Sequence, residues 1–303
     1  MKDLLTIGEL KKEEVREILS LAMEIKKNKE KFRNALKDKI LAMVFEKPSL
    51  RTRMTFEVGM LEMGGKAIYL GPSEIQLGKR ESVADVARNL ERWVDGIMIR
   101  TFGQENVEEM AKWAKPPVIN GLSDLHHPCQ ALADYFTLLE KFGKLEGLKL
   151  AYVGDGNNVC HSLIEGASKL GVHISVATPE GYEPKKEIVE RAMKEANSKI
   201  EILRDPVEAV KDADAIYTDT WTSMGQEHER EIRVKIFKPY QVNKSLMEKT
   251  GKKTYFMHCL PAHRGEEVTD EVIDSEYSLV FDEAENRLHV QKAIMYILMG
   301  GKV

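Results

Sequence analysis

The chain has 303 residues, of which 43% are hydrophobic, and its 45 lysines and arginines are nearly balanced by 49 aspartates and glutamates. A formal net charge of −4 argues against a protein that wraps nucleic acid, because such proteins need a dense basic face to displace counterions from phosphates. The length predicts about two domains, and the composition argues against a disordered or repetitive chain.

The three cysteines, Cys129, Cys160 and Cys259, are far apart and form no C-x-x-C pair. This pattern predicts reduced thiols rather than a disulfide framework or a zinc knuckle. The amino-terminal segment has no apolar stretch typical of an export signal, and no run approaches the ~18 apolar residues of a membrane span. We therefore expect a cytoplasmic protein without a membrane partner.

From residue 39 onward, short apolar or β-branched runs alternate with amphipathic stretches, a pattern typical of βαβ units and parallel sheets. A long helix followed by Gly143 and Gly147 is expected to bridge two halves. In the first half the pattern predicts strands at 39–45, 66–70, 96–100 and 117–120, and helices at 11–36, from 49, from 82, at 105–115 and at 128–142.

The second half repeats the alternation. A final helix is expected at 283–299, and its apolar face predicts that it packs against one of the two halves. The face alone does not determine which half, and we expect the first half. The predicted fold class is α/β, with two doubly wound parallel-sheet domains and bridging helices. The expected strands are 149–154, 172–177, 200–203, 215–219 and 254–258, and the expected domains are 1–143 and 147–282, with a carboxyl-terminal segment at 283–303.

Residues 49–53, Ser-Leu-Arg-Thr-Arg, follow the first expected strand and begin a helix. Free backbone N–H groups, the positive end of the helix dipole, two hydroxyls and two guanidiniums would face one anion there, and arginine suits the bidentate geometry of phosphate. The alternative is a helix-capping serine with two solvated arginines. The combination of strand, proline, cap and arginines favours a phosphate-bearing substrate.

Further polar residues stand where loops leave the expected sheet. Arg100 ends an apolar strand, where its charge is costly unless it meets an anion or a polarised carbonyl; the alternative is that it reaches solvent. His127 and Gln130 lie three residues apart at the start of the bridging helix and would share one face. The adjacent His126 and His127 also suggest a surface tract or metal ligands, but no third ligand at a familiar spacing supports a metal.

The second half offers candidates for another ligand site. Gly154 and Gly156 match a dinucleotide fingerprint, but Val159 stands at its third glycine position and no acidic residue follows the next strand, so a dehydrogenase is disfavoured. Asp219 ends a strand, and its carboxylate suits an alkylammonium group; the plain alternative is a β–α loop. Cys259 also follows a strand, although a lone cysteine is more often buried and inert than catalytic.

Four motifs in their order resemble those of the carbamoyltransferases, and the last two resemble the ornithine branch of that family. The resemblance extends from residue 45 to residue 290 and covers nearly the whole chain. One departure is Leu50, where the family usually carries threonine; a backbone N–H contact survives this change and a hydroxyl contact does not. The motifs are S-L-R-T-R at 49–53, H-P-C-Q at 127–130, D-x-x-x-S-M-G at 219–225 and H-C-L-P at 258–261.

The resemblance implies roles for individual residues. Arg100, His127 and Thr52 would face the carbamoyl oxygen, and Gln130 would face the carbamoyl amino group. Gln76 would reach the site of a neighbouring subunit, which implies a homotrimer or an assembly of trimers. The residues implied to bind carbamoyl phosphate are Ser49, Leu50, Arg51, Thr52, Gln76, Arg100, His127, Gln130, Cys259, Leu260 and Arg287. Those implied to bind ornithine are Asn158, Asp219, Ser223 and Met224, and the catalytic ones are Arg100, His127, Asp219 and Cys259.

The reaction implied by the resemblance transfers the carbamoyl group of carbamoyl phosphate to the δ-amine of L-ornithine and yields L-citrulline and phosphate. No metal and no organic cofactor is expected, because carbamoyl phosphate is already activated and no electrons move. Alternative acceptors are aspartate, putrescine and an N-acylated ornithine, and the S-M-G loop and H-C-L-P favour free ornithine. An alternative of another class is a catalytically silent protein that senses a phosphorylated metabolite.

Overall fold

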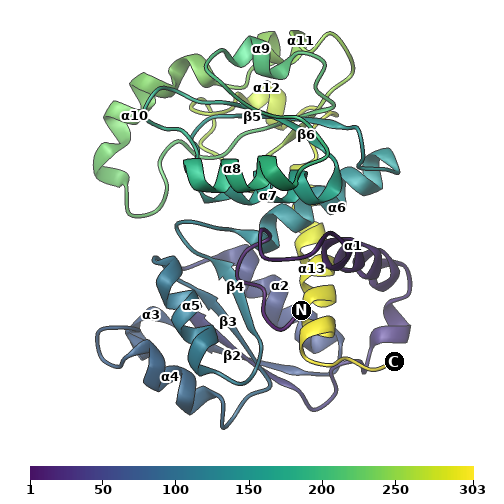
Figure 1. Cartoon of the computed structure of the whole chain (residues 1–303), viewed down its shortest axis with the longest axis vertical. Helices are drawn as coiled ribbons and strands as arrows, with labels where there is room; N and C mark the ends of the chain where they lie inside the picture. Colours follow the sequence, from purple (N-terminus) through teal and green to yellow (C-terminus); the bar gives the residue numbers. More distant parts are fainter. The chain divides into compact units, whose positions relative to one another are not determined.

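The structure is a computed structural model that describes all of residues 1–303. The chain forms two compact units, one of Met1–Phe136 with Glu285–Val303 and the other of Thr137–Ala284. The chain therefore starts in the first unit, forms the second from one continuous segment and ends in the first, where both termini lie (Figure 1).

The chain passes between the units inside two helices, α6 (Pro128–Phe142) and α13 (Val280–Leu298). The sequence pattern placed the domain limits at 143–147 and 282/283, whereas the units divide at 136/137 and 284/285. Helices that start in one unit and end in the other explain the difference, because glycines mark where a helix ends and not where its packing partners change.

A four-stranded parallel sheet is the centre of the first unit, with the strand order β2-β1-β3-β4. The chain goes from β1 to β2 in one direction and then back past β1 to β3, so the winding direction reverses between β1 and β3. In open α/β sheets, ligands bind beyond the carboxyl ends of the strands at such a reversal. The strands are β1 (Ile40–Phe45), β2 (Lys66–Leu70), β3 (Gly96–Arg100) and β4 (Val118–Leu122).

Helices cover both faces of this sheet because right-handed crossovers in the two winding directions lead to opposite sides (Figure 1). Apolar residues of β1 and β3, such as Val44 and Ile97, pack against α4 and α5 on one face. On the other face α2 approaches α13 closely, since a Cβ at Gly59 would lie 2.8 Å from Met295 Cε. The helices before the bridge are α1 (Lys12–Lys27), α2 (Leu50–Glu62), α3 (Pro72–Ile75), α4 (Val83–Leu90) and α5 (Gln104–Trp113).

The second unit contains a five-stranded parallel sheet with the order β7-β6-β5-β8-β9, and its winding direction reverses between β5 and β8. Helices α7 and α8 cover one face and α9, α11 and α12 the other (Figure 1). The strands are β5 (Lys149–Val153), β6 (His173–Ala177), β7 (Ile200–Leu203), β8 (Ala215–Tyr217) and β9 (Tyr255–Met257). The helices are α7 (Asn158–Leu170), α8 (Lys186–Glu195), α9 (Pro206–Val210), α10 (Arg230–Phe237), α11 (Lys244–Glu248) and α12 (Asp270–Ile273).

The predicted α/β fold class with two doubly wound parallel sheets is confirmed. The single helix predicted for 11–36 is wrong, because α1 ends at Lys27 and a separate 3₁₀ turn, η1 (Lys29–Phe32), follows. Asn28 leaves the helical conformation within a lysine-rich stretch, where like charges and a poor helix former disfavour continuation. None of the helices combines the length and the apolar character that crossing a membrane requires.

Candidate active site

The start of α2 forms a cradle at the carboxyl end of β1 that is a candidate anion site. Ser49 caps the helix in an extended conformation, and its Oγ accepts the N–H of Thr52 at 3.2 Å. Leu50 is 74% exposed, so the first turn offers its backbone N–H rather than its side chain. Arg51 follows and is half-buried. Backbone donors, a positive helix end and a guanidinium therefore come together, as an anion requires.

Two further arginines meet on the Thr52 hydroxyl. Thr52 Oγ1 accepts from Arg287 Nη2 at 3.1 Å and lies 3.5 Å from Arg100 Nη1, and all three side chains are buried. Arg100 comes from the end of β3 and Arg287 from α13. Because both guanidiniums only donate, the hydroxyl proton of Thr52 points elsewhere and is available to an oxygen of a ligand. Two buried positive charges side by side favour a bound anion.

His127 lies buried in the loop before α6 and shares this positive environment. Burial holds the pKa of its imidazole well below the ordinary value, and the charges of Arg287, Arg100 and Arg51 lower it further. At neutral pH His127 is therefore an uncharged imidazole that donates one N–H. Such a group polarises a carbonyl oxygen without adding to the positive charge.

Gln130 joins the cluster from the first turn of α6. Its Nε2 donates to Asp134 Oδ1 at 2.8 Å, and its Oε1 accepts from Arg287 Nη1 at 2.7 Å. Arg287 Nε in turn donates to Gln291 Oε1 at 2.8 Å. Sequence reasoning missed Asp134 and Gln291, although each stands four residues after a predicted site residue on the same helix, the spacing at which helical side chains meet.

The first unit thus brings together Thr52, Arg100, Gln130 and Arg287 through hydrogen bonds, with His127 in the same electrostatic environment. Gln76 is placed differently: it is exposed at the end of α3, in a left-handed conformation with φ +44°. Its role in a neighbouring subunit stays a prediction.

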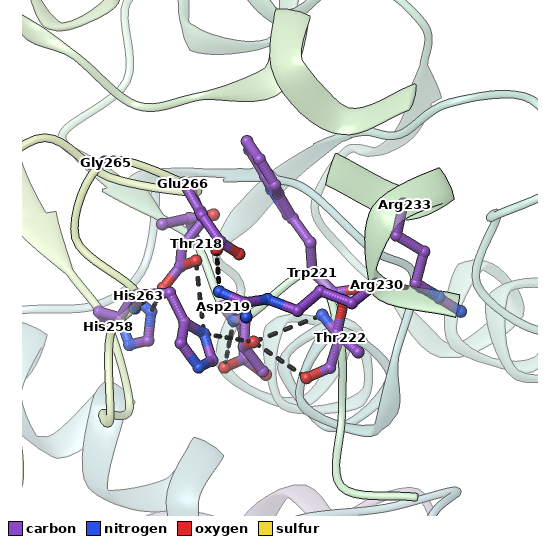
Figure 2. A network of polar contacts seen from close by, with 12 residues as sticks. Thr218, Asp219, Trp221, Thr222, Arg230, Arg233, His258, His263, Gly265 and Glu266 are labelled. Carbon is purple, nitrogen blue, oxygen red and sulfur yellow. Dashed lines mark hydrogen bonds and ion pairs between the residues drawn. The ribbon is translucent and has the colours of Figure 1, made fainter. Parts of the chain in front are cut away.

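In the second unit, Asp219 follows β8 and is buried in a polar network (Figure 2). Its Oδ1 lies 3.0 Å from Cys259 Sγ, and its Oδ2 accepts from Asn157 Nδ2 at 2.7 Å. Asn157 also caps α7, where its Oδ1 accepts the N–H groups of Val159 and Cys160. Sequence reasoning chose Asn158, the half-buried first residue of α7, and missed Asn157, which the preference for asparagine before a helix signals.

The H-C-L-P segment positions Cys259 through His258. Nδ1 of His258 accepts the N–H of Leu260 at 2.8 Å, so its proton is on Nε2, which donates to Glu267 Oε1 at 3.2 Å. The fully buried Glu267 also accepts the N–H of His263 at 2.6 Å. Leu260 adopts φ +56°, a conformation that a non-glycine residue keeps only when its surroundings hold it. Sequence reasoning missed Glu267 and His263.

The S-M-G loop follows Asp219 and leads into α10. Met224 is 43% exposed, and the N–H of Ser223 donates to Gln226 Oε1 at 3.2 Å. Arg233 of α10 holds the start of the loop, because its Nη1 donates to Trp221 O at 2.9 Å and to Asp155 Oδ2 at 3.0 Å. Burial raises the pKa of Asp155 to about 6, although Arg233 opposes this increase.

Two groups of side chains have ligand atoms close enough to hold a metal ion: Asp219 with His258 and Cys259, and His263 with Glu266 and Glu267. His126 and His127, which the sequence offered as metal ligands, belong to neither group. Several of the grouped side chains make hydrogen bonds within the protein: Nδ1 of His258 accepts from a backbone amide, and Glu266 pairs with Arg230 (Figure 2).

Comparisons with known proteins identify the family. The carbamoyl-P binding domain of aspartate/ornithine carbamoyltransferase matches residues 2–140, and the Asp/Orn binding domain of the same family matches residues 146–298. This chain is accordingly a member of the aspartate/ornithine carbamoyltransferase family.

Within the family, the chain is similar to ornithine carbamoyltransferases. That of Thermococcus kodakarensis is 56% identical over 99% of this chain and 97% of the relative, and the anabolic one of Pyrococcus furiosus is 54% identical over 99% and 97%. Among solved structures, ornithine carbamoyltransferase from Pyrococcus furiosus has a TM-score of 0.96 at 54% identity, covering 100% of this chain and 98% of that one. The one from Thermus thermophilus has a TM-score of 0.90 at 48% identity, covering 99% of each. The resemblance to the ornithine branch is confirmed.

Proposed function

We propose that this chain catalyses the transfer of the carbamoyl group of carbamoyl phosphate to the δ-amine of L-ornithine, giving L-citrulline and phosphate. The observation that carries the proposal is the meeting of Arg100 and Arg287 on the Thr52 hydroxyl near neutral His127, within the unit that matches a carbamoyl-P binding domain. The first unit binds carbamoyl phosphate, and the second unit binds ornithine.

The carbamoyl phosphate half binds the phosphate and stabilises the oxyanion that forms on the carbamoyl group. Ser49 and Arg51, with the backbone N–H groups of the first turn of α2, hold the phosphate and stabilise it as it leaves. Thr52, Arg100 and His127 donate to the carbamoyl oxygen, which becomes an oxyanion when the amine attacks. Removing one such donor typically lowers the rate by ~10²–10³-fold.

The ornithine half orients the nucleophile. The Asp219 carboxylate, with Cys259 Sγ 3.0 Å away, receives the δ-ammonium group, which must lose a proton before its nitrogen has a lone pair for attack. Asn158 binds the α-carboxylate, and the loop with Ser223 and Met224 closes on the amino-acid end. Leu260 and Cys259 also contact the carbamoyl group. A putrescine enzyme would have no α-carboxylate to bind.

The assembly and location of the protein complete the proposal. A homotrimer, or an assembly of trimers, would let Gln76, which is exposed on its loop, enter the site of a neighbouring subunit. Three cysteines without a disulfide suit the reducing cytoplasm. Light scattering on the purified protein is expected to give a multiple of three chain masses, and a monomer with full activity would exclude a shared site.

The direct test measures citrulline and phosphate from purified protein, carbamoyl phosphate and four separate acceptors: ornithine, putrescine, aspartate and N-acetylornithine. Ornithine-dependent citrulline with equimolar phosphate is expected. Activity with another acceptor would keep the assignment of the first unit and overturn that of the second. Binding of carbamoyl phosphate without any product would instead support a silent sensor.

A further inference from the structure

The amide of Gln130 is held between two buried groups from two helices of the first unit. Nε2 of Gln130 donates to Asp134 Oδ1 at 2.8 Å, one turn later on α6, and Oε1 accepts from Arg287 Nη1 of α13 at 2.7 Å. Gln130, Asp134 and Arg287 are each at most 1% exposed. Water therefore does not replace either hydrogen bond.

These two neighbours allow only one orientation of the amide. A guanidinium group only donates hydrogen bonds, and a carboxylate only accepts them. If the amide turned over, its NH₂ would face Arg287 and its oxygen would face Asp134, so both hydrogen bonds would be lost inside the protein. Arg287 is itself fixed, because its Nε donates to the buried Gln291.

The orientation decides what Gln130 offers to a ligand. Its oxygen lies on the side of Arg287, whose Nη2 reaches Thr52 at 3.1 Å, and this is the cluster that binds the carbamoyl group in the proposed function. A carbonyl oxygen has two lone pairs and Arg287 uses one. The second accepts an N–H of the carbamoyl amino group, which a methyl group at the same place does not supply.

We propose that Asp134 is a positioning residue that keeps the Gln130 oxygen toward the substrate, and that the site thereby selects a carbamoyl group over an acetyl group on phosphate. This inference rests on the proposed function and adds to it the source of donor specificity. Asp134 acts through Gln130 and does not contact the reacting atoms.

The test uses two stable ligands that differ only at the group in question. Phosphonoacetamide carries the amino group and acetonylphosphonate carries a methyl in its place, and calorimetry on the full chain without ornithine measures the affinity for each. In Asp134→Leu the carboxylate acceptor is replaced by an apolar side chain, and the preference for phosphonoacetamide is expected to fall on the order of tenfold. The affinity for inorganic phosphate is expected to change less than about twofold, since the start of α2 is intact.

Four further variants separate positioning from a general structural effect. Asp134→Asn keeps an oxygen that accepts from the Gln130 NH₂, and Arg287 still donates to the Gln130 oxygen. This variant is therefore expected to retain most of the preference for phosphonoacetamide. Gln130→Met removes the amide, and adding Asp134→Leu to it is expected to cause no further loss. Asp95→Leu is the control for losing an aspartate that accepts hydrogen bonds, because Asp95 accepts from Lys39 and Ile40 but stands before β3 at the opposite end of the sheet.

An unchanged preference in Asp134→Leu would overturn the inference, and so would an equal loss of affinity for all three ligands, which indicates a merely structural role. If Asp134→Leu does not fold, as judged by circular dichroism, Asp134→Ala is measured by the same criteria. Citrulline formation by the wild-type chain keeps the two proposals distinct. A wild type that makes citrulline while Asp134→Leu keeps its preference contradicts only the role of Asp134, whereas a wild type that makes none contradicts the proposed function.

Discussion

Two buried histidines show how neighbours decide what a single side chain offers. His127 lies among three arginines and is neutral because burial and these charges both disfavour its protonated form. His258 lies between a backbone amide and Glu267, which fixes its proton on Nε2. The same residue type is therefore, in the proposed function, a donor to a ligand in one unit, and it is a structural link in the other.

Removing a charged group from the first unit or from the second should impair the use of different substrates. Arg51→Ala is expected to raise the KM for carbamoyl phosphate by ~10–100-fold, because a charge-assisted hydrogen bond to the phosphate is lost. Asp219→Asn is expected to lower kcat/KM for ornithine by at least about tenfold, because it weakens the hold on the δ-ammonium group. Steady-state kinetics with each substrate varied in turn measures both effects. Equal and small changes in both variants would contradict the assignment of the units.

The lowered pKa of His127 has a consequence for stability. In the unfolded chain a histidine titrates near its ordinary ~6.5, so below this pH the unfolded state binds a proton that the folded state does not. Stability therefore falls as the pH decreases through this range, by up to ~1.4 kcal/mol per pH unit. His127→Gln removes this dependence, so its stability relative to the wild type should rise by roughly 1–2 kcal/mol between pH 7.5 and 5.

Guanidinium chloride unfolding at both pH values measures this difference. His228→Gln, which changes a 75% exposed side chain, serves as the control and is expected to follow the wild type. A constant offset between His127→Gln and the wild type would show that His127 takes up its proton equally in the folded and unfolded states, and would contradict the lowered pKa.

Among the secondary-structure elements, neighbouring strands bring the chemical groups together. Phe45 at the end of β1 is paired with Arg100 of β3, and Tyr152 of β5 with Tyr217 of β8, so the segments that follow these strands emerge side by side. In both units these neighbours flank the point where the winding direction reverses. The cradle and the polar network of Asp219 thus lie where parallel sheets bind ligands.

Helix α10 depends on one buried ion pair, and its loss is expected to affect ornithine use. Arg233→Met leaves the Asp155 charge buried and removes the hydrogen bond to Trp221 O, so we expect a destabilisation of ~3–5 kcal/mol and a higher KM for ornithine. Arg230→Met on the same helix removes a side chain that is 56% exposed and its ion pair with Glu266, and should cost at most ~1 kcal/mol.

The penalty for Arg233→Met should also depend on pH. Burial raises the pKa of Asp155 to about 6 against the opposing charge of Arg233, so the pKa lies higher still when Arg233 is replaced. The cost of the buried Asp155 charge is therefore relieved as the pH falls and the carboxyl is protonated. Denaturant unfolding at pH 7.5 and 5 is expected to show a smaller difference from the wild type at pH 5. Equal penalties for Arg233→Met and Arg230→Met would contradict an anchoring role.

For the whole molecule, the decisive feature is that the first unit needs both ends of the chain. Arg287 of α13 binds Thr52 and Gln130, and Met295 packs against Gly59 of α2. The second unit, by contrast, is one continuous segment, Thr137–Ala284. The two units should therefore differ in how they respond to being separated.

We expect the fragment 137–284 to unfold cooperatively and the fragment 1–136 to remain unfolded. Joining 1–136 to 285–303 through a short Gly-Ser linker should restore folding and phosphate binding. The cut ends are close, since Lys26 Nζ lies 3.5 Å from Glu285 Oε1 and 5.9 Å from the centre of the Phe136 ring. Circular dichroism and phosphate titration of the three polypeptides measure this. Phosphate binding by 1–136 alone would show that α13 is dispensable.

The sequence by itself determined the α/β class, the alternation of strands and helices, the family and the residues proposed for the two candidate sites, because these depend on local periodicity and on motifs of adjacent residues. S-L-R-T-R predicted a helix start with an anion site, and Ser49 does cap α2. The sequence pattern also predicted that Arg100 ends a strand, and Arg100 is the last residue of β3.

Only the tertiary structure decided which distant residues act together. Asn157 and Glu267 carry no motif that the sequence analysis used, and each matters through a contact with a side chain outside its own helix or turn: Asp219 and His258. The tertiary structure also decided that most of α13 belongs to the first unit, which an apolar helix face alone does not specify. The physical reason is that a hydrogen bond between buried groups depends on their positions in space, which neither local propensity nor spacing along the chain encodes.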